Sequence, residues 1–328
     1  MKREIILEVK DLVKYFSLGR NVFLGQEKIV RAVNGISFQL YQGETLGLVG
    51  ESGCGKSTLC RTIMRLCEPT SGEVIYEGKN IFSLNNKKIL AVRRDIQMVF
   101  QDPYASLNPR MTIDDIIGEG LEIHNLAFGK KRKERICELL ETVGLNPGYA
   151  NRFPHEFSSG QRQRIGIARC LAVNPKLIIC DEPISALDVS IQAQIINMLE
   201  ELQAKYGLTY LFITHDLSVV KHLCHRVAVM YFGRIVELAD NFSLYEDPLH
   251  PYTQALLSSI PNPDPDVEVP AHRFRLPGKM PDPMDPPSGC YFHPRCPEMQ
   301  KVCIQSNPEL IERRKGHWAA CHLIEQLR

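Results

Sequence analysis

The sequence predicts an α/β fold built around a mainly parallel sheet. Three short apolar runs are each long enough for one buried strand, namely TLGLV (residues 45–49), LIIC (177–180) and YLFIT (210–214). Helical stretches lie around them, with apolar residues at three- and four-residue spacing. Strands that alternate with helices are typical of parallel sheets, because the helix returns the chain to the edge where the next strand starts. The 328 residues suffice for one large or two modest domains.

The N-terminal part predicts a small antiparallel β region. Apolar and polar residues alternate through the first 45 or so positions, as in ILEVKDLVKYF and VRAVNGISFQL, on either side of a hairpin-like insert near Gly19 to Gln26. Such alternation is typical of strands with one buried and one solvated face. We therefore expect strands on both sides of this insert.

A phosphate-binding motif follows the first buried strand. Residues 50–57 read GESGCGKS and match G-x-x-x-x-G-K-[ST], in which glycines let successive backbone N–H groups turn inward around phosphate oxygens. We expect Lys56 to reach the β- and γ-phosphates of a nucleotide and the Ser57 hydroxyl to bind Mg²⁺. The residues predicted to bind the nucleotide here are Gly50, Ser52, Gly53, Cys54, Gly55, Lys56, Ser57 and Thr58.

The stretch from about Pro103 to Phe157 predicts a helical subdomain. It contains MTIDDIIGEGLEIHNL and KERICELLETVGL, in which apolar residues recur at the spacing of one helix face. A strand candidate, IQMVF, precedes this stretch and is expected to end at Gln101.

Two carboxylates follow the second buried strand. Asp181 and Glu182 come directly after LIIC, so both are expected at the sheet edge where ligands of α/β proteins bind. Asp181 is predicted to hold Mg²⁺ through water, and Glu182 to orient or deprotonate an attacking water. The alternative is a pair of solvated acids in a loop.

A serine–glycine motif opens the next helical stretch. Ser158, Gly160 and Gln161 stand before RQRIGIARCLA, and together with the two preceding motifs they make the chain resemble the ABC ATPase superfamily. The resemblance implies ATP hydrolysis in a head-to-tail dimer. In that family the serine and the following amides bind the γ-phosphate of ATP held by the opposite subunit.

The resemblance also implies roles for three further residues. Gln101 matches the glutamine that touches Mg²⁺ and senses the membrane subunit, and His215 matches the histidine that contacts the γ-phosphate. Phe16 best matches the aromatic residue that stacks on adenine, although the adjacent Tyr15 would also offer a flat π-face. Lys56, Glu182 and His215 are therefore the predicted catalytic residues.

Ser159 departs from the family pattern, which usually has glycine at this position. A Cβ there could crowd the phosphate or block a backbone conformation with positive φ. We expect weakened rather than lost activity. A nucleotide switch that does not hydrolyse ATP is the alternative, which Glu182 and His215 argue against.

Further segments narrow the resemblance to the ATP-binding subunits of bacterial dipeptide and oligopeptide importers. These importers carry two paired ATP-binding subunits, and the chain resembles the second of them. These segments are VFQDPYASLNPRMTI (99–113), SALDVSIQAQ (185–194), HPYT (250–253) and PPSGCYFHPRCP (286–297). The implied partners are a homologous ATP-binding subunit, two transmembrane permease subunits and, indirectly, an extracellular solute-binding protein. Nickel or another small solute is an alternative cargo, and a soluble ABC ATPase outside transport is an alternative class.

The resemblance implies a peripheral protein on the cytoplasmic face of the membrane, and the composition agrees with it. There are 39 basic and 38 acidic residues, which argues against a surface built to bind nucleic acid. No signal peptide is visible at the start, and no run approaches the roughly 18 apolar residues of a spanning helix. We therefore expect membrane attachment through a partner.

The C-terminal part predicts an extension that carries four cysteines. We expect an ATPase domain over residues 1–247 and an extension over 248–328, with a proline-rich connector from Pro261 to Pro287. The four cysteines near the end are Cys290, Cys296, Cys303 and Cys321. Four thiols on a small module suggest an inorganic staple.

Four states of these thiols remain open, and two of them, zinc and an iron–sulfur cluster, are inorganic staples. Disulfides are disfavoured in a cytosol, and structural zinc usually shows a tighter C-x2–4-C pair than the sequence offers. A [4Fe–4S] cluster, which the resemblance implies, is the favoured ligand. Four thiols without a ligand complete the set.

Overall fold

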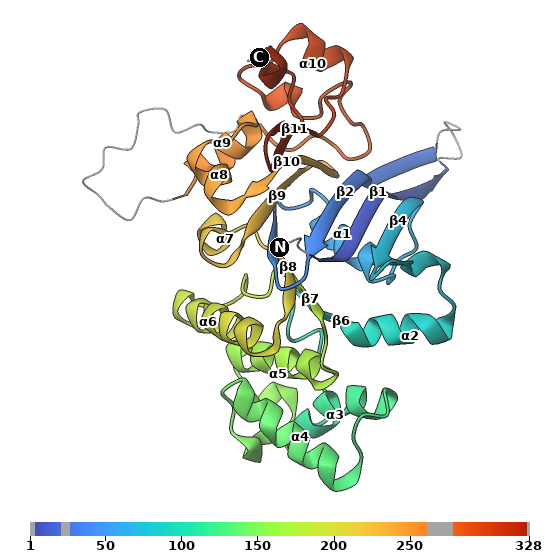
Figure 1. The fold of residues 1–328 in the computed structure, drawn as a ribbon, viewed down its shortest axis with the longest axis vertical. Helices are drawn as coiled ribbons and strands as arrows, with labels where there is room; N and C mark the ends of the chain where they lie inside the picture. The colour runs from blue at the N-terminus through green and yellow to red at the C-terminus, as the bar shows by residue number, and fades with distance from the viewer. Residues whose placement is uncertain (1–3, 21–26, 261–277, 327–328) are drawn as a thin grey trace, which may run out of the picture. The chain divides into compact units, whose positions relative to one another are not determined.

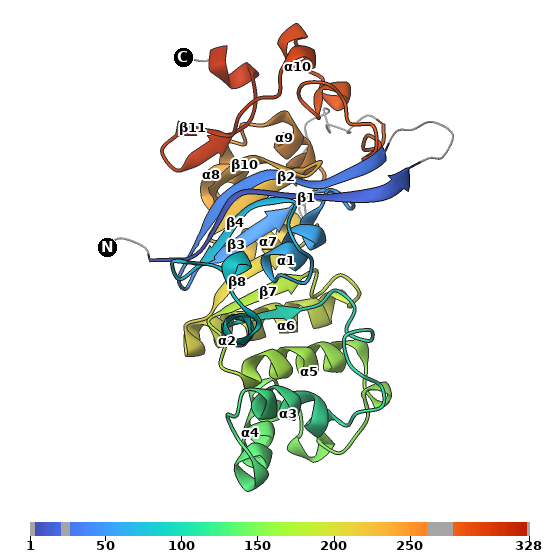
Figure 2. The same cartoon turned by 90° about the vertical axis from the view of Figure 1, so that its right-hand side faces the viewer.

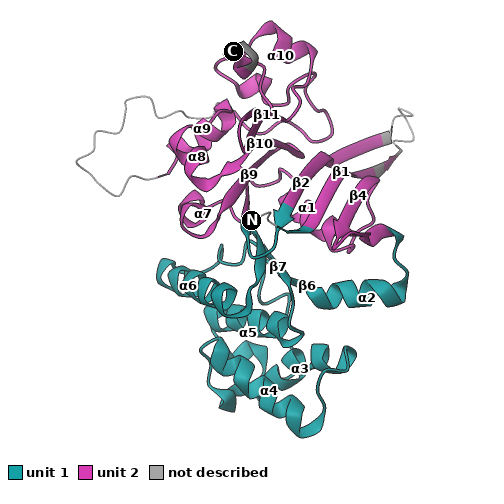
Figure 3. Ribbon diagram, in the orientation of Figure 1, with its two compact units in different colours: residues 1–6, 40–45, 83–213 teal, residues 7–39, 46–82, 214–328 magenta. Residues whose placement is uncertain are grey.

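The computed structural model describes residues 4–20, 27–260 and 278–326 (Figure 1). The insert at Gly19–Gln26 and the first part of the proline-rich connector lie largely outside these residues. The chain forms two compact units, one of residues 1–6, 40–45 and 83–213 and one of residues 7–39, 46–82 and 214–328 (Figure 3). The predicted domain boundary after residue 247 lies inside the second unit and stays a prediction.

The first unit contains three parallel strands, β6 (Ile96–Val99), β7 (Leu177–Asp181) and β8 (Thr209–Ile213). β6 pairs with β7, and β7 pairs with β8, each in parallel register. Every residue of β7 and β8 is buried, which explains why these strands read as continuous apolar runs rather than alternating ones. Because the strands are parallel, their carboxyl ends meet at one edge of the sheet.

Five helices complete the first unit: α2 (Asn86–Asp95), α3 (Ile113–Ile123), α4 (Gly129–Thr142), α5 (Ser159–Ala172) and α6 (Val189–Tyr206). α3 and α4 pack on α5 and on each other (Figure 2). The two amphipathic stretches that predicted helices thus form α3 and α4. The strand expected to end at Gln101 ends earlier, and Gln101 lies in the loop that follows β6.

The second unit contains a small antiparallel sheet with the strand order β2-β1-β4-β5 (Figure 1). Its strands are β1 (Ile5–Arg20), β2 (Glu27–Tyr41), β4 (Ser71–Tyr76) and β5 (Lys79–Asn80), and the outermost residues of β1 and β2 count with the first unit. β1 pairs antiparallel with β4, with an irregularity between Lys10 and Val13. The predicted antiparallel β region is confirmed.

The second unit also has a mixed group of strands, β3 (Thr45–Val49), β9 (Arg226–Tyr231), β10 (Arg234–Asp240), β11 (Ile311–Arg314) and β12 (His317–Ala319). β3 and β9 run parallel, whereas β9–β10, β10–β12 and β11–β12 are antiparallel. The last two strands come from the predicted extension, and β12 pairs with β10 through Glu237↔Ala319 and Leu238↔Trp318. The predicted α/β class with parallel strands is confirmed.

Short helices connect the strands of the second unit. They are α1 (Lys56–Ile63), α7 (Leu217–Leu223), α8 (Asn241–Glu246), α9 (Pro251–Ser258) and α10 (Lys301–Gln305). Single 3₁₀ turns span Ile81–Ser83, Pro147–Tyr149, Pro154–Glu156, His293–Arg295 and Leu323–Gln326. Within the described residues, no helix has both the length and the apolar character needed to cross a membrane.

Candidate nucleotide-binding site

The phosphate loop, residues 50–57, joins β3 to α1 in a conformation that requires glycine at two positions. Gly50 and Gly55 have φ of 154° and 109°. A Cβ on Gly50 would lie 2.2 Å from the carbonyl oxygen of Met230, and one on Gly55 would lie 2.0 Å from that of Ala32. No side chain fits either place, so the backbone of the loop packs directly against its neighbours.

Lys56 is buried at the start of α1, with a relative exposure of 5%. Its ammonium donates hydrogen bonds to the carbonyl oxygens of Gly50 at 2.7 Å and Glu51 at 3.0 Å. The positive charge is therefore held inside the loop rather than in solvent. The neighbouring Cys54 is buried too, and burial raises the pKa of its thiol, so it stays neutral beside the lysine.

The remaining residues of the motif flank this lysine. Ser57 and Thr58 occupy the first turn of α1, where the backbone N–H groups have no partner within the helix and the helix dipole favours an anion. Ser52 and Gly53 lie at the exposed tip of the loop. The arrangement is that of an anion cradle with one fixed cation.

Phe16 lies on β1 and is 39% exposed. Its ring face is near the ammonium of Lys14, whose nitrogen is 4.8 Å from the ring centroid. The adjacent Tyr15 is more tightly held, since its hydroxyl hydrogen-bonds Asn34 Oδ1 at 2.6 Å. The exposure of the ring keeps Phe16 as the better candidate for stacking on a base.

Asp181 and Glu182 lie at the carboxyl end of β7, in the first unit. Asp181 is 1% exposed, and Glu182 has a left-handed backbone with φ of 45°. Such a conformation is costly for a residue other than glycine, and it persists where the surrounding structure fixes it. Here the Glu182 N–H donates to Ile213 O at 3.0 Å.

Gln101 lies beside Glu182 at the same edge of the sheet. Its Nε2 donates to Glu182 Oε2 at 2.9 Å. The structure therefore brings together two residues that the sequence separates by 81 positions. One offers an amide oxygen and the other a carboxylate, the kinds of oxygen that Mg²⁺ and water favour.

Ser158 caps α5 in a reciprocal arrangement with Gln161. The Gln161 N–H donates to Ser158 Oγ at 3.3 Å, and the Ser158 N–H donates to Gln161 Oε1 at 3.0 Å. Gly160 is required sterically, because a Cβ on it would lie 2.6 Å from Ile191 Cγ2. Ser159 is the first residue of α5 and has no positive φ, so the concern that serine blocks the backbone conformation is wrong.

His215 follows β8 in the second unit and is exposed. The preceding Thr214 N–H donates to Leu48 O at 3.4 Å, which ties this segment to β3. The next residue, Asp216, caps α7 by accepting from the Ser218 N–H at 2.8 Å. A strand end on one side and a helix start on the other thus fix the backbone that carries His215.

Two contacts to the phosphate loop were not predicted from the sequence. Arg295 forms a bidentate ion pair with Glu51, with distances of 2.8 Å and 2.9 Å, and the Glu51 N–H donates to Tyr252 Oη at 2.9 Å. Both partners come from the predicted extension. The segments HPYT and HPRCP contribute to the family resemblance, but no local pattern connects them to a loop more than 200 residues earlier.

The four C-terminal cysteines lie in one part of the second unit, but not as a metal centre. Burial, with a smaller contribution from the other three thiols, raises the pKa of Cys321 to about 12. None of the four forms a disulfide. Among the described residues, no group of three or more His, Cys, Asp or Glu side chains is placed to hold a metal. The predicted iron–sulfur cluster and its zinc alternative therefore gain no support from this arrangement.

Comparison with protein-family models gives two matches. Residues 33–185 match the family described as ABC transporter, and residues 236–303 match the oligopeptide/dipeptide transporter C-terminal region. The first match contains the phosphate loop, the serine–glycine motif and both carboxylates. The second contains Tyr252 and Arg295.

Curated relatives cover almost the whole chain. The putative oligopeptide transport ATP-binding protein YkfD of Bacillus subtilis is 55% identical over 98% of this chain and 97% of its own length. The oligopeptide transport ATP-binding protein AppF of the same organism is 54% identical, over 98% of each. OppF of Escherichia coli is 49% identical over 99% of this chain and 98% of its own length.

Among solved structures, the ATP-binding cassette MJ0796 is similar to this chain. Its dimeric post-hydrolysis structure, bound to ADP and Pi, has a TM-score of 0.64 and 30% sequence identity. The match covers 72% of this chain and 98% of that protein. About a quarter of the chain therefore has no counterpart in that solved relative.

Proposed function

This chain belongs to the ABC transporter family of ATP-binding subunits, with the C-terminal region of oligopeptide and dipeptide transporters, and from that membership we propose that it hydrolyses ATP to power peptide import. The resemblance drawn from the sequence motifs is confirmed. The observation that carries the choice of cargo is the near-complete coverage of relatives named as oligopeptide transport proteins, extension included.

The predicted residues have different roles in the proposed chemistry. In the second unit, the phosphate loop binds the nucleotide phosphates, with Lys56 neutralising charge on the γ-phosphate and Phe16 stacking on the base. In the first unit, Glu182 orients or deprotonates the attacking water, held in place by its hydrogen bond from Gln101. His215 is proposed to contact the γ-phosphate.

The chemistry of each residue proposed to bind Mg²⁺ suits this ion. The hydroxyl of Ser57, the amide oxygen of Gln101 and the buried carboxylate of Asp181 are hard oxygen ligands of the kind this ion prefers. When bound, the ion would neutralise charge that develops on the transferred phosphoryl group.

We assign the partners by the same reasoning. Ser158, Gly160 and Gln161 are proposed to bind the γ-phosphate of ATP on a homologous subunit, which agrees with the dimer described for MJ0796. Two permease subunits would carry the peptide across the membrane and hold this chain at its cytoplasmic face. Contacts near Gln101 would transmit closure of the dimer to them.

The proposal is tested by phosphate release from MgATP. The full chain, alone and with its co-purified membrane subunits, should release phosphate, and Glu182→Gln should reduce turnover by about a hundredfold or more while leaving ATP binding intact. Glu141→Gln is the matched control, because Glu141 is an exposed acid on α4. Binding without turnover in the parent would indicate a nucleotide switch, and normal turnover in Glu182→Gln would remove this residue from its role.

A further inference from the structure

Glu51, the second residue of the phosphate loop, is held by the C-terminal part of the chain at two points. Its carboxylate accepts from both terminal nitrogens of Arg295, and its backbone N–H donates to Tyr252 Oη. Arg295 lies 244 positions further along the chain and is 6% exposed. A bidentate pair between a nearly buried arginine and a carboxylate fixes orientation as well as distance.

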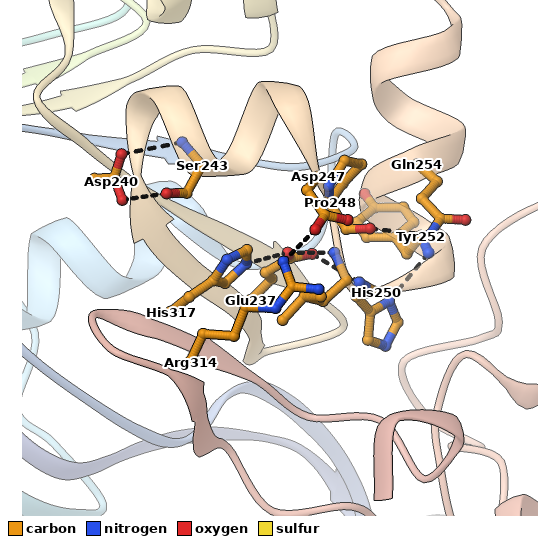
Figure 4. Close-up of polar contacts among 11 residues, drawn as sticks. Glu237, Asp240, Ser243, Asp247, Pro248, His250, Tyr252, Gln254, Arg314 and His317 are labelled. Atoms are coloured by element: carbon orange, nitrogen blue, oxygen red, sulfur yellow. Dashed lines mark hydrogen bonds and ion pairs between the residues drawn. The ribbon is translucent and has the colours of Figure 1, made fainter. Parts of the chain in front are cut away.

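The groups that hold Glu51 are themselves rigid. Tyr252 has no exposed surface and packs against the rings of Tyr231 and Phe292, with centroids 4.7 Å and 5.5 Å away. Its backbone N–H donates to His250 Nδ1 at 3.0 Å (Figure 4). Phe292 directly precedes the turn that contains Arg295. Both residues that contact Glu51 therefore belong to, or directly follow, one packed group of aromatic rings.

The contacts that fix Glu51 also affect the position of Lys56, the cation of the loop. The Glu51 carbonyl oxygen is one of the two backbone carbonyls that accept from the Lys56 ammonium, at 3.0 Å. The backbone of residue 51 is thus fixed through its N–H by Tyr252 and contacts Lys56 through its carbonyl. A shift of Glu51 would displace the acceptor that locates the lysine.

The charge of Glu51 poses a second problem for a loop that binds phosphates. A free carboxylate there would repel the nucleotide. Burial alone would lower the pKa of Arg295, but its hydrogen bonds to the Glu51 carboxylate raise that pKa. The guanidinium is therefore charged and neutralises the carboxylate. The ion pair removes a repulsive charge from the loop and fixes its position.

We propose that Arg295 and Tyr252 are positioning residues for the phosphate loop, through which the C-terminal extension sets the affinity of the ATPase for nucleotide. The inference rests on the proposed function and extends it, because neither residue touches the nucleotide itself. It gives the extension a part in nucleotide binding.

The test measures MgATP dissociation constants of the full chain by isothermal titration. Arg295→Met leaves the Glu51 carboxylate unpaired, and it should raise the dissociation constant by about tenfold or more. The double variant Glu51→Gln with Arg295→Met removes the stranded charge and should return to within about threefold of the parent. Lys301→Met is the matched control, since Lys301 is an exposed cation of the same extension, and it should change affinity less than about twofold.

Two further variants keep the test decisive if Arg295→Met fails to fold. Arg295→Lys keeps the charge but not the bidentate geometry, and Tyr252→Phe removes only the hydroxyl; each should weaken MgATP binding by about threefold or more. Parental affinity in both, or in a folded Arg295→Met, would overturn the inference. So would a double variant that binds no better than Arg295→Met. If the parent itself does not bind MgATP, the proposed function fails instead.

Discussion

Glu237 gives a prediction about what attaches the extension to the sheet of the second unit. It lies on β10 with no exposed surface, and its carboxylate accepts three hydrogen bonds (Figure 4). The donors are the N–H groups of Leu249 and His250, at 2.7 Å and 2.9 Å, and His317 Nε2 at 2.7 Å. One side chain thus ties two separate segments of the extension to the sheet.

Glu237→Gln should destabilise this arrangement strongly. The amide retains one carbonyl oxygen as an acceptor, but its NH₂ group then faces an N–H donor instead of accepting from it. Hydrogen bonds to a charged group contribute about 1.5–3 kcal/mol each, and a buried donor left without an acceptor adds to the loss. We therefore expect a decrease of roughly 3 kcal/mol in the free energy of unfolding of the extension.

The assay is urea unfolding followed by tryptophan fluorescence. Trp318 is the single tryptophan of the chain and stands next to His317 on β12, so its signal reports on the docking of this strand. Glu246→Gln, a substitution of an exposed acid on the nearby α8, is the control and should leave the transition unchanged. A loss below about 1 kcal/mol in Glu237→Gln, with an unchanged urea slope, would refute the reasoning.

Three other predictions concern single side chains. Burial lowers the pKa of His250 to about 4. As the pH falls from about 6.5 to 4, this histidine is therefore protonated in the unfolded chain but stays neutral in the folded chain. The free energy of unfolding should fall by about 3 kcal/mol over that range. His250→Asn keeps a helix cap and should flatten this part of the stability curve; identical curves would contradict the assignment. Gly55→Ala should raise the MgATP dissociation constant by more than about tenfold, because the backbone is left-handed and the new Cβ meets a carbonyl, whereas Gly78→Ala, where φ is also positive but the Cβ meets open space, should bind normally. The raised pKa of Cys321 should slow its alkylation at pH 8 by about a hundredfold or more relative to the urea-unfolded chain, and equal rates would count against its burial.

Features that depend on neighbouring residues could be predicted from the sequence. The phosphate loop is one, because its glycines, Lys56 and the flanking strand and helix all lie within a few residues of one another. The buried strands β7 and β8 are another, since each is an uninterrupted apolar run. The same holds for the Ser158–Gln161 cap, whose two partners are three positions apart.

Features that depend on contacts between distant parts of the chain could not be predicted from the sequence. No local pattern pairs Glu51 with Arg295, because the tertiary fold alone brings together positions 244 apart. The end of the strand before Gln101 was misplaced because an apolar phenylalanine extends the pattern of β6 beyond its last paired residue, Val99. The expectation that Ser159 blocks the backbone conformation failed because the helix that it opens sets its φ, which the family pattern of glycine does not reveal.

The central claim, that ATP hydrolysis by this chain powers peptide import, is tested most directly by uptake into proteoliposomes. The full chain would be reconstituted with the membrane subunits that co-purify with it, with MgATP on the side of this chain and a labelled dipeptide and its binding protein on the other. We predict ATP-dependent peptide uptake in the parent and none above background with Lys56→Met. Hydrolysis without peptide uptake, or uptake of nickel in place of peptide, would contradict the account.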